Sequence, residues 1–308
     1  MAEAARIDAD LIDQATLTRG ISFMLLGVAL FTFNDALGKW LITEVAVGQL
    51  LFVRSAAAML MLLPFILRSG WRSALLVTRP RLHVLRVLLI MGEVAGFYLA
   101  VRHLPLADVM SAYQAAPLIV TLLAIPMLGE RVGWRRGLAV AVGFVGVLLV
   151  LKPSGDIFGS EASSLVPGLI ALGGTVAYAL LVILTRQCIR HGAGNLVLIT
   201  WHTLGVGLFG LLTLPWGWAA IDATTLALLG LIGVVATLAH ICINHALKLA
   251  PAPLVVPYQY TSLLWAMLLG WIFFADIPST SMLIGAAIIV ASGLFVLHRQ
   301  NKKQSEAA

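Results

Sequence analysis

Long apolar runs follow one another along most of the chain and are separated by short polar segments. An α-helix needs about 20 apolar residues to cross the hydrocarbon layer, because each residue adds ~1.5 Å of length. Runs of that length lie at 20–41, 46–67, 82–102, 105–128, 133–152, 165–188, 194–215, 224–247, 251–275 and 278–298. The pattern therefore predicts an all-α membrane protein with ten transmembrane helices.

The composition supports a lipid environment. The chain is 60% hydrophobic and 11% charged, with a mean hydropathy of +0.99. Soluble proteins have about 25% charged residues, so the polar side chains here are too few to cover a soluble enzyme. The net charge of +6 is divided among loops rather than gathered on one face, which argues against nucleic acid as a partner. Cys188 and Cys242 lie inside apolar runs and are expected to be buried.

Lys and Arg are divided unevenly between the two sets of predicted loops. With the N-terminus in the cytoplasm, most of the 20 Lys and Arg residues fall on the cytoplasmic side, Arg86 among them. Cytoplasmic loops of membrane proteins are enriched in these residues. Both termini are therefore expected in the cytoplasm, as tails over 1–19 and 299–308, with a periplasmic linker at 153–164.

The chain also contains an internal repeat. A basic residue, a proline three positions later and a Tyr-Gln pair occur twice, as Arg102, Pro105, Tyr113 and Gln114, and as Lys248, Pro251, Tyr258 and Gln259. An acidic residue follows each copy, at Glu130 and Asp276. Each copy belongs to five predicted spans, over 20–152 and 165–298, and the odd number inverts the second copy in the membrane. Such inverted repeats hold a substrate site near the midplane, between the halves.

Prolines and small residues indicate the roles of individual spans. Pro117 and Pro126 in the fourth span and Pro257 in the ninth free backbone carbonyls, which lipid tolerates only where they face protein or water. We expect these two spans to be kinked and to line the cavity. The fifth and tenth spans carry small residues four apart, Ala139/Gly143 and Ala287/Ala291. This spacing favours close helix packing or a homodimer contact at the periphery.

Two five-span copies, each with the basic residue and proline before its fourth span, closely resemble the drug/metabolite transporter superfamily. Within it, the chain resembles the ten-helix branch built from two EamA-type domains. The resemblance implies a bacterial inner-membrane carrier of small metabolites without an ATPase. Members export amino acids and their analogues or import S-adenosylmethionine or riboflavin, and the segment from Asn34 to Lys39 is similar to the importers. We expect export of an amino acid or related compound, with uptake of S-adenosylmethionine or a riboflavin-like metabolite as the alternative.

Three charged residues lie inside the first two predicted spans. A charged side chain in hydrocarbon costs roughly 2.5–3.5 kcal/mol on insertion scales, so each needs a partner or a function. Asp35 and Lys39 are four residues apart on one helix face and can pair, and Asp35 can instead hold Arg54. The cluster either binds a charged or zwitterionic substrate or locks the two spans together.

Glu93 lies near the middle of the third predicted span. A carboxylate at that depth either couples transport to protons or binds a cationic substrate group, or it serves as a hydrogen-bonding contact between helices. The proton is thus the coupling ion expected here, and no other cofactor is predicted.

His240 and Asn244 are four apart and share a face of the eighth span, where they either line the cavity or bond to another helix. His245 does not complete the zinc spacing, so no metal site is predicted. Tyr113, Gln114, Tyr258 and Gln259 act either as substrate ligands and gates or as packing contacts. Trp265 presents its ring either to the substrate or to lipid and core.

The mechanism expected is alternating access without ATP, because the chain has no phosphate-binding loop of the G-x-x-x-x-G-K-[ST] type. The rival is an intramembrane enzyme acting on lipid-linked substrates, which needs a convergent acid, base and nucleophile. The polar residues here are spread over several spans instead. We therefore predict a transporter that is not an enzyme.

Overall fold

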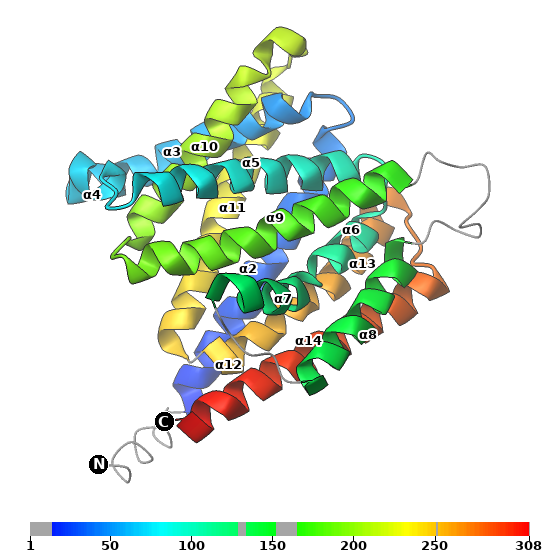
Figure 1. The fold of residues 1–308 in the computed structure, drawn as a ribbon. Helices are drawn as coiled ribbons and strands as arrows, with labels where there is room; N and C mark the ends of the chain where they lie inside the picture. The colour runs from blue at the N-terminus through cyan, green and yellow to red at the C-terminus, as the bar shows by residue number, and fades with distance from the viewer. Residues whose placement is uncertain (1–13, 129–133, 152–164, 251, 308) are drawn as a thin grey trace.

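The computed structural model describes residues 14–128, 134–151, 165–250 and 252–307, which are almost entirely helical (Figure 1). Within these residues there is no strand, and the all-α prediction is confirmed. Most of the predicted N-terminal tail, the linker at 153–164 and Glu130 lie outside the described residues.

The helices of the first half are α2 (Gln14–Leu41), α3 (Val47–Ser69), α4 (Trp71–Leu75), α5 (Pro80–Val101), α6 (Leu106–Tyr113), α7 (Ala116–Leu128) and α8 (Trp134–Leu151). Those of the second half are α9 (Leu165–Arg190), α10 (Asn195–Leu212), η1 (Leu214–Trp216), α11 (Ala223–Leu249), α12 (Ala252–Val255), η2 (Val256–Thr261), α13 (Ser262–Phe274) and α14 (Thr280–Ala307). The last helix, α14, thus continues into the predicted C-terminal tail at 299–308.

Among the described residues, seven helical segments are long and apolar enough to cross a membrane. They are Ala15–Leu41, Val47–Ser69, Pro80–Val101, Leu106–Leu123, Val166–Arg190, Asn195–Trp216 and Ala223–Leu249. Two further apolar stretches, Gly137–Val150 and Thr280–Val296, are shorter. The chain is a multi-pass membrane protein, and the arrangement of ten spans stays a prediction.

The fourth and ninth predicted spans are interrupted, as their prolines indicate. α6 ends at Tyr113 and α7 begins at Ala116, where Pro117 has no N–H to donate back toward the preceding turn. In the ninth span, the 3₁₀ segment η2 separates α12 from α13 and contains Pro257. The helix interruptions therefore occur at equivalent places in the two halves.

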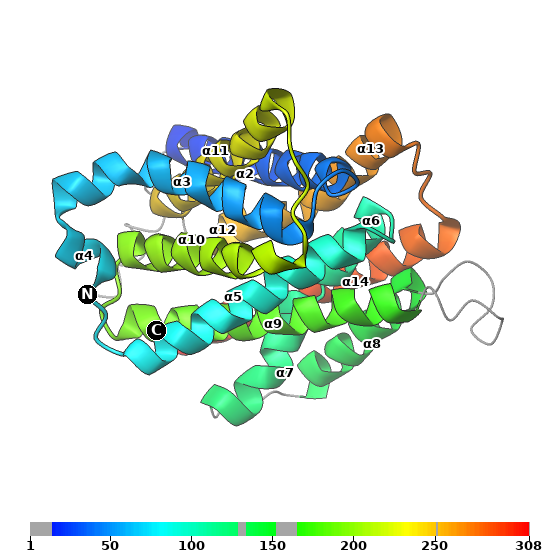
Figure 2. The same cartoon turned by 90° about the horizontal axis from the view of Figure 1, so that it is seen from above.

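The helices pair in a pattern that repeats between the halves (Figures 1 and 2). α2 packs along α11, and α5 packs along α9. If helices are matched by their order in each half, α2 corresponds to α9 and α5 to α11, so these two contacts are equivalent. α3 packs on α10, its own counterpart, and also on α11.

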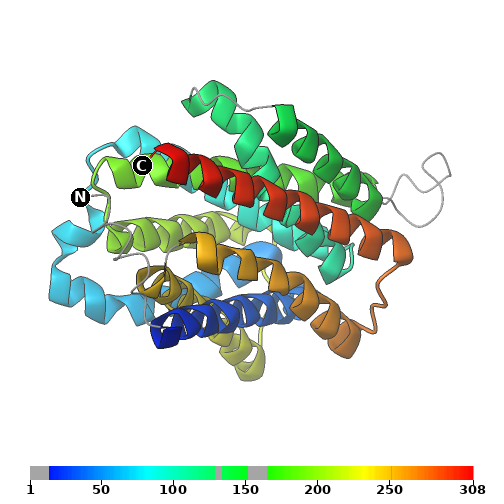
Figure 3. The same ribbon diagram turned by 90° about the horizontal axis from the view of Figure 1, so that it is seen from below.

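α8 and α14 are also counterparts, and they lie side by side (Figure 3). Gly146 and Gly285 allow the two helices to approach closely, because a Cβ on either would meet the other's backbone oxygen. Ala287 and Ala291 do not form a packing contact within the chain, since both are exposed on the opposite face of α14, and a homodimer contact through them stays a prediction. The buried face is the one that carries Gly285, Ile289 and Ser292.

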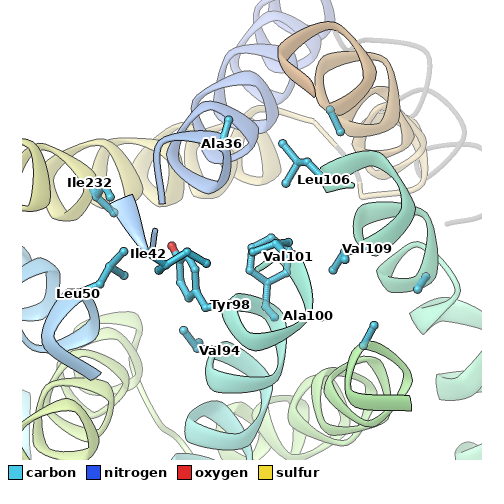
Figure 4. Close-up of a cluster of buried hydrophobic side chains, with 14 of the residues drawn as sticks. Ala36, Ile42, Leu50, Val94, Tyr98, Ala100, Val101, Leu106, Val109 and Ile232 are labelled. Carbon is cyan, nitrogen blue, oxygen red and sulfur yellow. The ribbon is translucent and has the colours of Figure 1, made fainter. Parts of the chain in front are cut away.

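The largest buried apolar cluster surrounds α5 (Figure 4). Tyr98 lies at its centre, between Ala36 of α2, Leu50 of α3 and Ile232 of α11. Gly38 of α2 permits this, because a Cβ there would collide with the Tyr98 ring. The core thus fixes a tyrosine hydroxyl where helices of both halves meet.

Candidate functional site

A cavity of about 270 Å³ lies between α3, α5, α9, α10 and α11, and so between the halves. Its polar lining residues are Arg54, Ser55, Arg86, Thr185, Asn195, His202, Thr203, Thr237, His240 and Asn244. The described residues that line it include two arginines and no Asp or Glu. Among the described residues that line this cavity, none belongs to α6, α7, η2 or α13, so the fourth and ninth spans do not line it as predicted.

The cavity extends from the middle of α3 toward one end of the bundle. Arg54 lies in the third turn of α3, whereas Leu62 lies further along α3 and Arg86 lies in the second turn of α5. Ile189 and Asn195 flank the short connection between α9 and α10. These helix ends are the ones predicted to face the cytoplasm.

Arg54 is held by a contact between α3 and α5. Its Nη1 donates a hydrogen bond of 3.1 Å to the hydroxyl of Tyr98, and its guanidinium lies 5.9 Å from the centre of that ring. Gly233 of α11 packs directly on the Arg54 backbone, where a Cβ would collide with the carbonyl oxygen. The arginine is therefore positioned by packing from two neighbouring helices.

The predicted pairing of Asp35 with Lys39 is wrong. Lys39 instead forms an ion pair with Asp276, with 2.9 Å between Nζ and Oδ2, because the end of α2 packs against the end of α13. Among the described residues no ion pair joins Asp35 to Arg54 either. Asp35 accepts a hydrogen bond of 2.9 Å from the amide of its neighbour Asn34.

Asp35 and Glu93 nevertheless lie close to Arg54, since the charges of all three groups act on one another. Both carboxyl groups are partly buried. The contact from Glu93 to the next helix is made by its backbone, whose carbonyl accepts a 3.0 Å hydrogen bond from the Tyr113 hydroxyl. Two acidic groups therefore lie within electrostatic range of Arg54, although neither lines the cavity.

His240 and Asn244 both line the cavity, as does His202. The His240 ring lies 6.0 Å from that of His202 and 4.6 Å from that of Phe31, with its Nδ1 2.9 Å from the Ala236 carbonyl oxygen. His202 lies on α10. The structure places it among polar residues of α10 and α11.

Arg86 is the main residue that sequence reasoning misplaced. It was expected at the cytoplasmic surface, but it is only 5% exposed and lines the cavity. Its Nε donates to Thr185 Oγ1 at 3.0 Å and its Nη1 to the Leu198 carbonyl at 3.1 Å. Its depth was the available signal, since it lies inside the predicted span 82–102 rather than before it.

The Tyr-Gln pairs lie away from the cavity, at the two helix interruptions. The Gln114 amide donates to the Gln259 carbonyl at 2.9 Å and to Ser262 Oγ at 2.7 Å, which joins the two halves. The Tyr258 carbonyl accepts from Thr261 Oγ1 at 2.6 Å. Trp265 is 37% exposed and does not line the cavity.

Polar contacts join helix ends at the other end of the bundle. Beyond its ion pair with Asp276, Lys39 lies 4.5 Å from the centre of the Phe274 ring. The Gln49 side chain exchanges two hydrogen bonds with the backbone of Ala219, at 2.8 and 3.1 Å. These contacts join helix ends on the side predicted to be periplasmic.

A sequence profile described as the EamA-like transporter family matches this chain twice, at residues 18–152 and 167–298. The chain is also similar to bacterial proteins over most of its length. An S-adenosylmethionine uptake transporter of Rickettsia prowazekii (strain Madrid E) is 26% identical, covering 94% of this chain and 96% of that protein. A riboflavin transporter of Rhizobium johnstonii is 28% identical, covering 94% of each.

A pseudopaline exporter of Pseudomonas aeruginosa is 25% identical and covers 90% of this chain and 95% of that protein. A solved crystal structure with 16% sequence identity has the same fold, with a TM-score of 0.59, and covers 94% of this chain and 99% of its own. The relatives thus include proteins that work in opposite directions.

Replacement of Gln114 by Leu is expected to destabilise the contact between the halves. Two hydrogen bonds to Gln259 and Ser262 are lost, at a cost of about 1–3 kcal/mol in total. This loss of stability is measured as a lower thermal unfolding midpoint of the detergent-purified protein. Gln259→Leu is the matched control, because only the backbone of Gln259 takes part in the contact. Equal midpoints for the two variants would contradict the assignment.

Proposed function

Because the chain belongs to the EamA-like transporter family, we propose that it is a secondary transporter that moves a small metabolite by alternating access between two inverted halves. The observation that carries this proposal is the polar cavity, which lies between helices of both halves and reaches from mid-helix toward one end of the bundle. Transporters of this type bind substrate near the membrane midplane, where their repeats meet.

The inverted arrangement is supported by three independent observations. The family profile matches once in each half, the repeated motif interrupts equivalent helices, and the contact of α2 with α11 is matched by that of α5 with α9. Ten spans with both termini in the cytoplasm of a bacterial inner membrane fit these observations and the distribution of Lys and Arg.

The substrate class that the geometry supports best is an amino acid or a related compound. The guanidinium of Arg54 is suited to a carboxylate, and Asp35 and Glu93 offer acidic groups close by for an ammonium group. The volume of about 270 Å³ is below the ~300–1,000 Å³ that is usual for sites of drug-sized ligands. An amino acid fits such a cavity without a rearrangement.

Uptake of S-adenosylmethionine or a riboflavin-like metabolite is the second candidate. The names of the Rickettsia and Rhizobium relatives favour it, although their identity to this chain is low. Both molecules are larger than an amino acid, so the cavity has to widen to admit them. We propose export as the direction for the amino-acid class and uptake for this alternative.

Alternating access requires the closed end of the bundle to open. The ion pair of Lys39 with Asp276 and the hydrogen bonds of Gln49 with Ala219 are the contacts that have to break. They join α2 to the end of α13, and α3 to the segment before α11. We assign them to the periplasmic gate of the transport cycle.

The substrate assignment is tested by counterflow in proteoliposomes with labelled amino acids, S-adenosylmethionine and riboflavin. For the compound that is transported, Arg54→Gln is expected to reduce the rate at least about tenfold, because a charge-assisted hydrogen bond contributes ~1.5–3 kcal/mol. Arg102→Gln, at an exposed position beyond α5, is the control and should keep the wild-type rate. No flux of any compound with the wild-type protein would refute the transporter proposal.

Proton coupling is proposed for Glu93, whose side chain is near Asp35, Arg54, Tyr113 and Tyr178. A carboxylate couples transport to a proton only if it gains and loses that proton during the cycle. Glu93→Gln should therefore flatten the dependence of the transport rate on pH, while exchange of substrate at equal pH continues. A pH profile identical to that of the wild type would exclude Glu93 from coupling.

The gate is tested by exchanging its charges. Lys39→Glu and Asp276→Lys each place like charges together and should lower the transport rate several-fold, because the closed end no longer forms. The double variant restores an opposite-charge pair and should recover most of the rate. If the double variant is as impaired as the worse single variant, or if the single variants transport normally, the pair has no gating role.

A further inference from the structure

Arg86 lies in the cavity as a buried charge whose partners are neutral. Its two hydrogen bonds go to a threonine hydroxyl and to a backbone carbonyl, of Thr185 and Leu198. An arginine side chain carries five N–H donors, so these two hydrogen bonds leave other N–H groups of Arg86 available to a ligand. Within the described chain no ion pair reaches Arg86, and the cavity lining contains no acid.

A helix contact alone does not explain a charge at this position. Removing a charged group from water costs several kcal/mol unless an opposite charge is bound nearby. A neutral side chain could donate hydrogen bonds to the same two acceptors without that cost. The side chain is 5% exposed, so water provides little compensation. His202, which faces the same cavity, is acted on by the charges of both Arg86 and Arg54, so the surroundings are cationic.

We propose that Arg86 is an anion-binding residue in the part of the cavity nearest the predicted cytoplasmic end, and that the transported metabolite therefore carries a carboxylate or a phosphate group that meets Arg86 before Arg54. This inference rests on the proposed transport function and narrows its substrate class to acidic compounds. Arg54 remains the inner site for the anionic group.

The two arginines form successive positions rather than one clamp. Arg54 bonds to Tyr98, which lies about 18 Å further along α5 than Arg86, given ~1.5 Å of rise per residue. A small dianion entering from the predicted cytoplasmic end meets Arg86 first and Arg54 afterwards. Arg86 thus selects acidic compounds at the entrance, and Arg54 holds them at mid-membrane.

Binding is tested on the purified full-length protein in detergent by thermal unfolding with succinate and with inorganic phosphate. Succinamide, which has the same shape as succinate without its charge, is the ligand control. We expect both anions to raise the midpoint of the wild type and succinamide to leave it unchanged. In Arg86→Gln the apparent affinity for the anions should fall at least tenfold, and in Arg86→Lys by less.

Arg81→Gln is the matched variant, since Arg81 is an exposed arginine in the first turn of the same helix. It should respond to the anions like the wild type. The inference is overturned if neither anion stabilises the wild type, or if Arg86→Gln binds them as the wild type does. Transport is measured in a separate experiment. A protein that binds anions but transports nothing would refute the proposed function, and the anion-site proposal would still stand.

Discussion

A guanidinium group in the middle of a membrane helix cannot face hydrocarbon, and the position of Arg54 constrains much of this bundle. Its side chain needs a polar surface inside the protein, which Tyr98 and the cavity provide. The Tyr98 ring has room only because Gly38 has no side chain. In the same way, the absence of a side chain at Gly233 leaves room for the Arg54 backbone. The burial of this one charge thus depends on close contacts of α3 with α5 and α11.

The same constraint explains why the polar residues are spread over several helices. Each ionisable side chain inside the membrane has to turn toward the space between the halves, since lipid provides no hydrogen bonds. Helices from both halves contribute to that space, and their contacts repeat between the halves. Two interrupted helices meet beside it through Gln114 and the Gln259 carbonyl, where the freed backbone groups find partners within the protein.

Local sequence patterns predict the positions of the helices well, but they predict poorly which side chains and which helices contact one another. The apolar runs located the helices, and Pro117 and Pro257 marked the interruptions, because both signals act within a few residues. The partner of Lys39 lies far away in the sequence, at Asp276, and helical spacing suggested Asp35 instead. Arg86 was counted with the charges of the cytoplasmic side, because a count of charges ignores depth. The choice of cavity-lining helices depends on packing between segments, which no local pattern encodes.

The central claim is that a polar cavity between the halves opens to one side of the membrane and later to the other. Labelling of a single cysteine placed at Thr203 or Thr237, in a chain whose Cys188 and Cys242 are replaced by alanine, tests it most directly. In membrane vesicles of known orientation, a charged thiol reagent should reach both positions from the cytoplasmic side, and the Lys39→Glu change should add labelling from the periplasmic side. Labelling from neither side, or from the periplasmic side alone in the unaltered gate, would contradict the account.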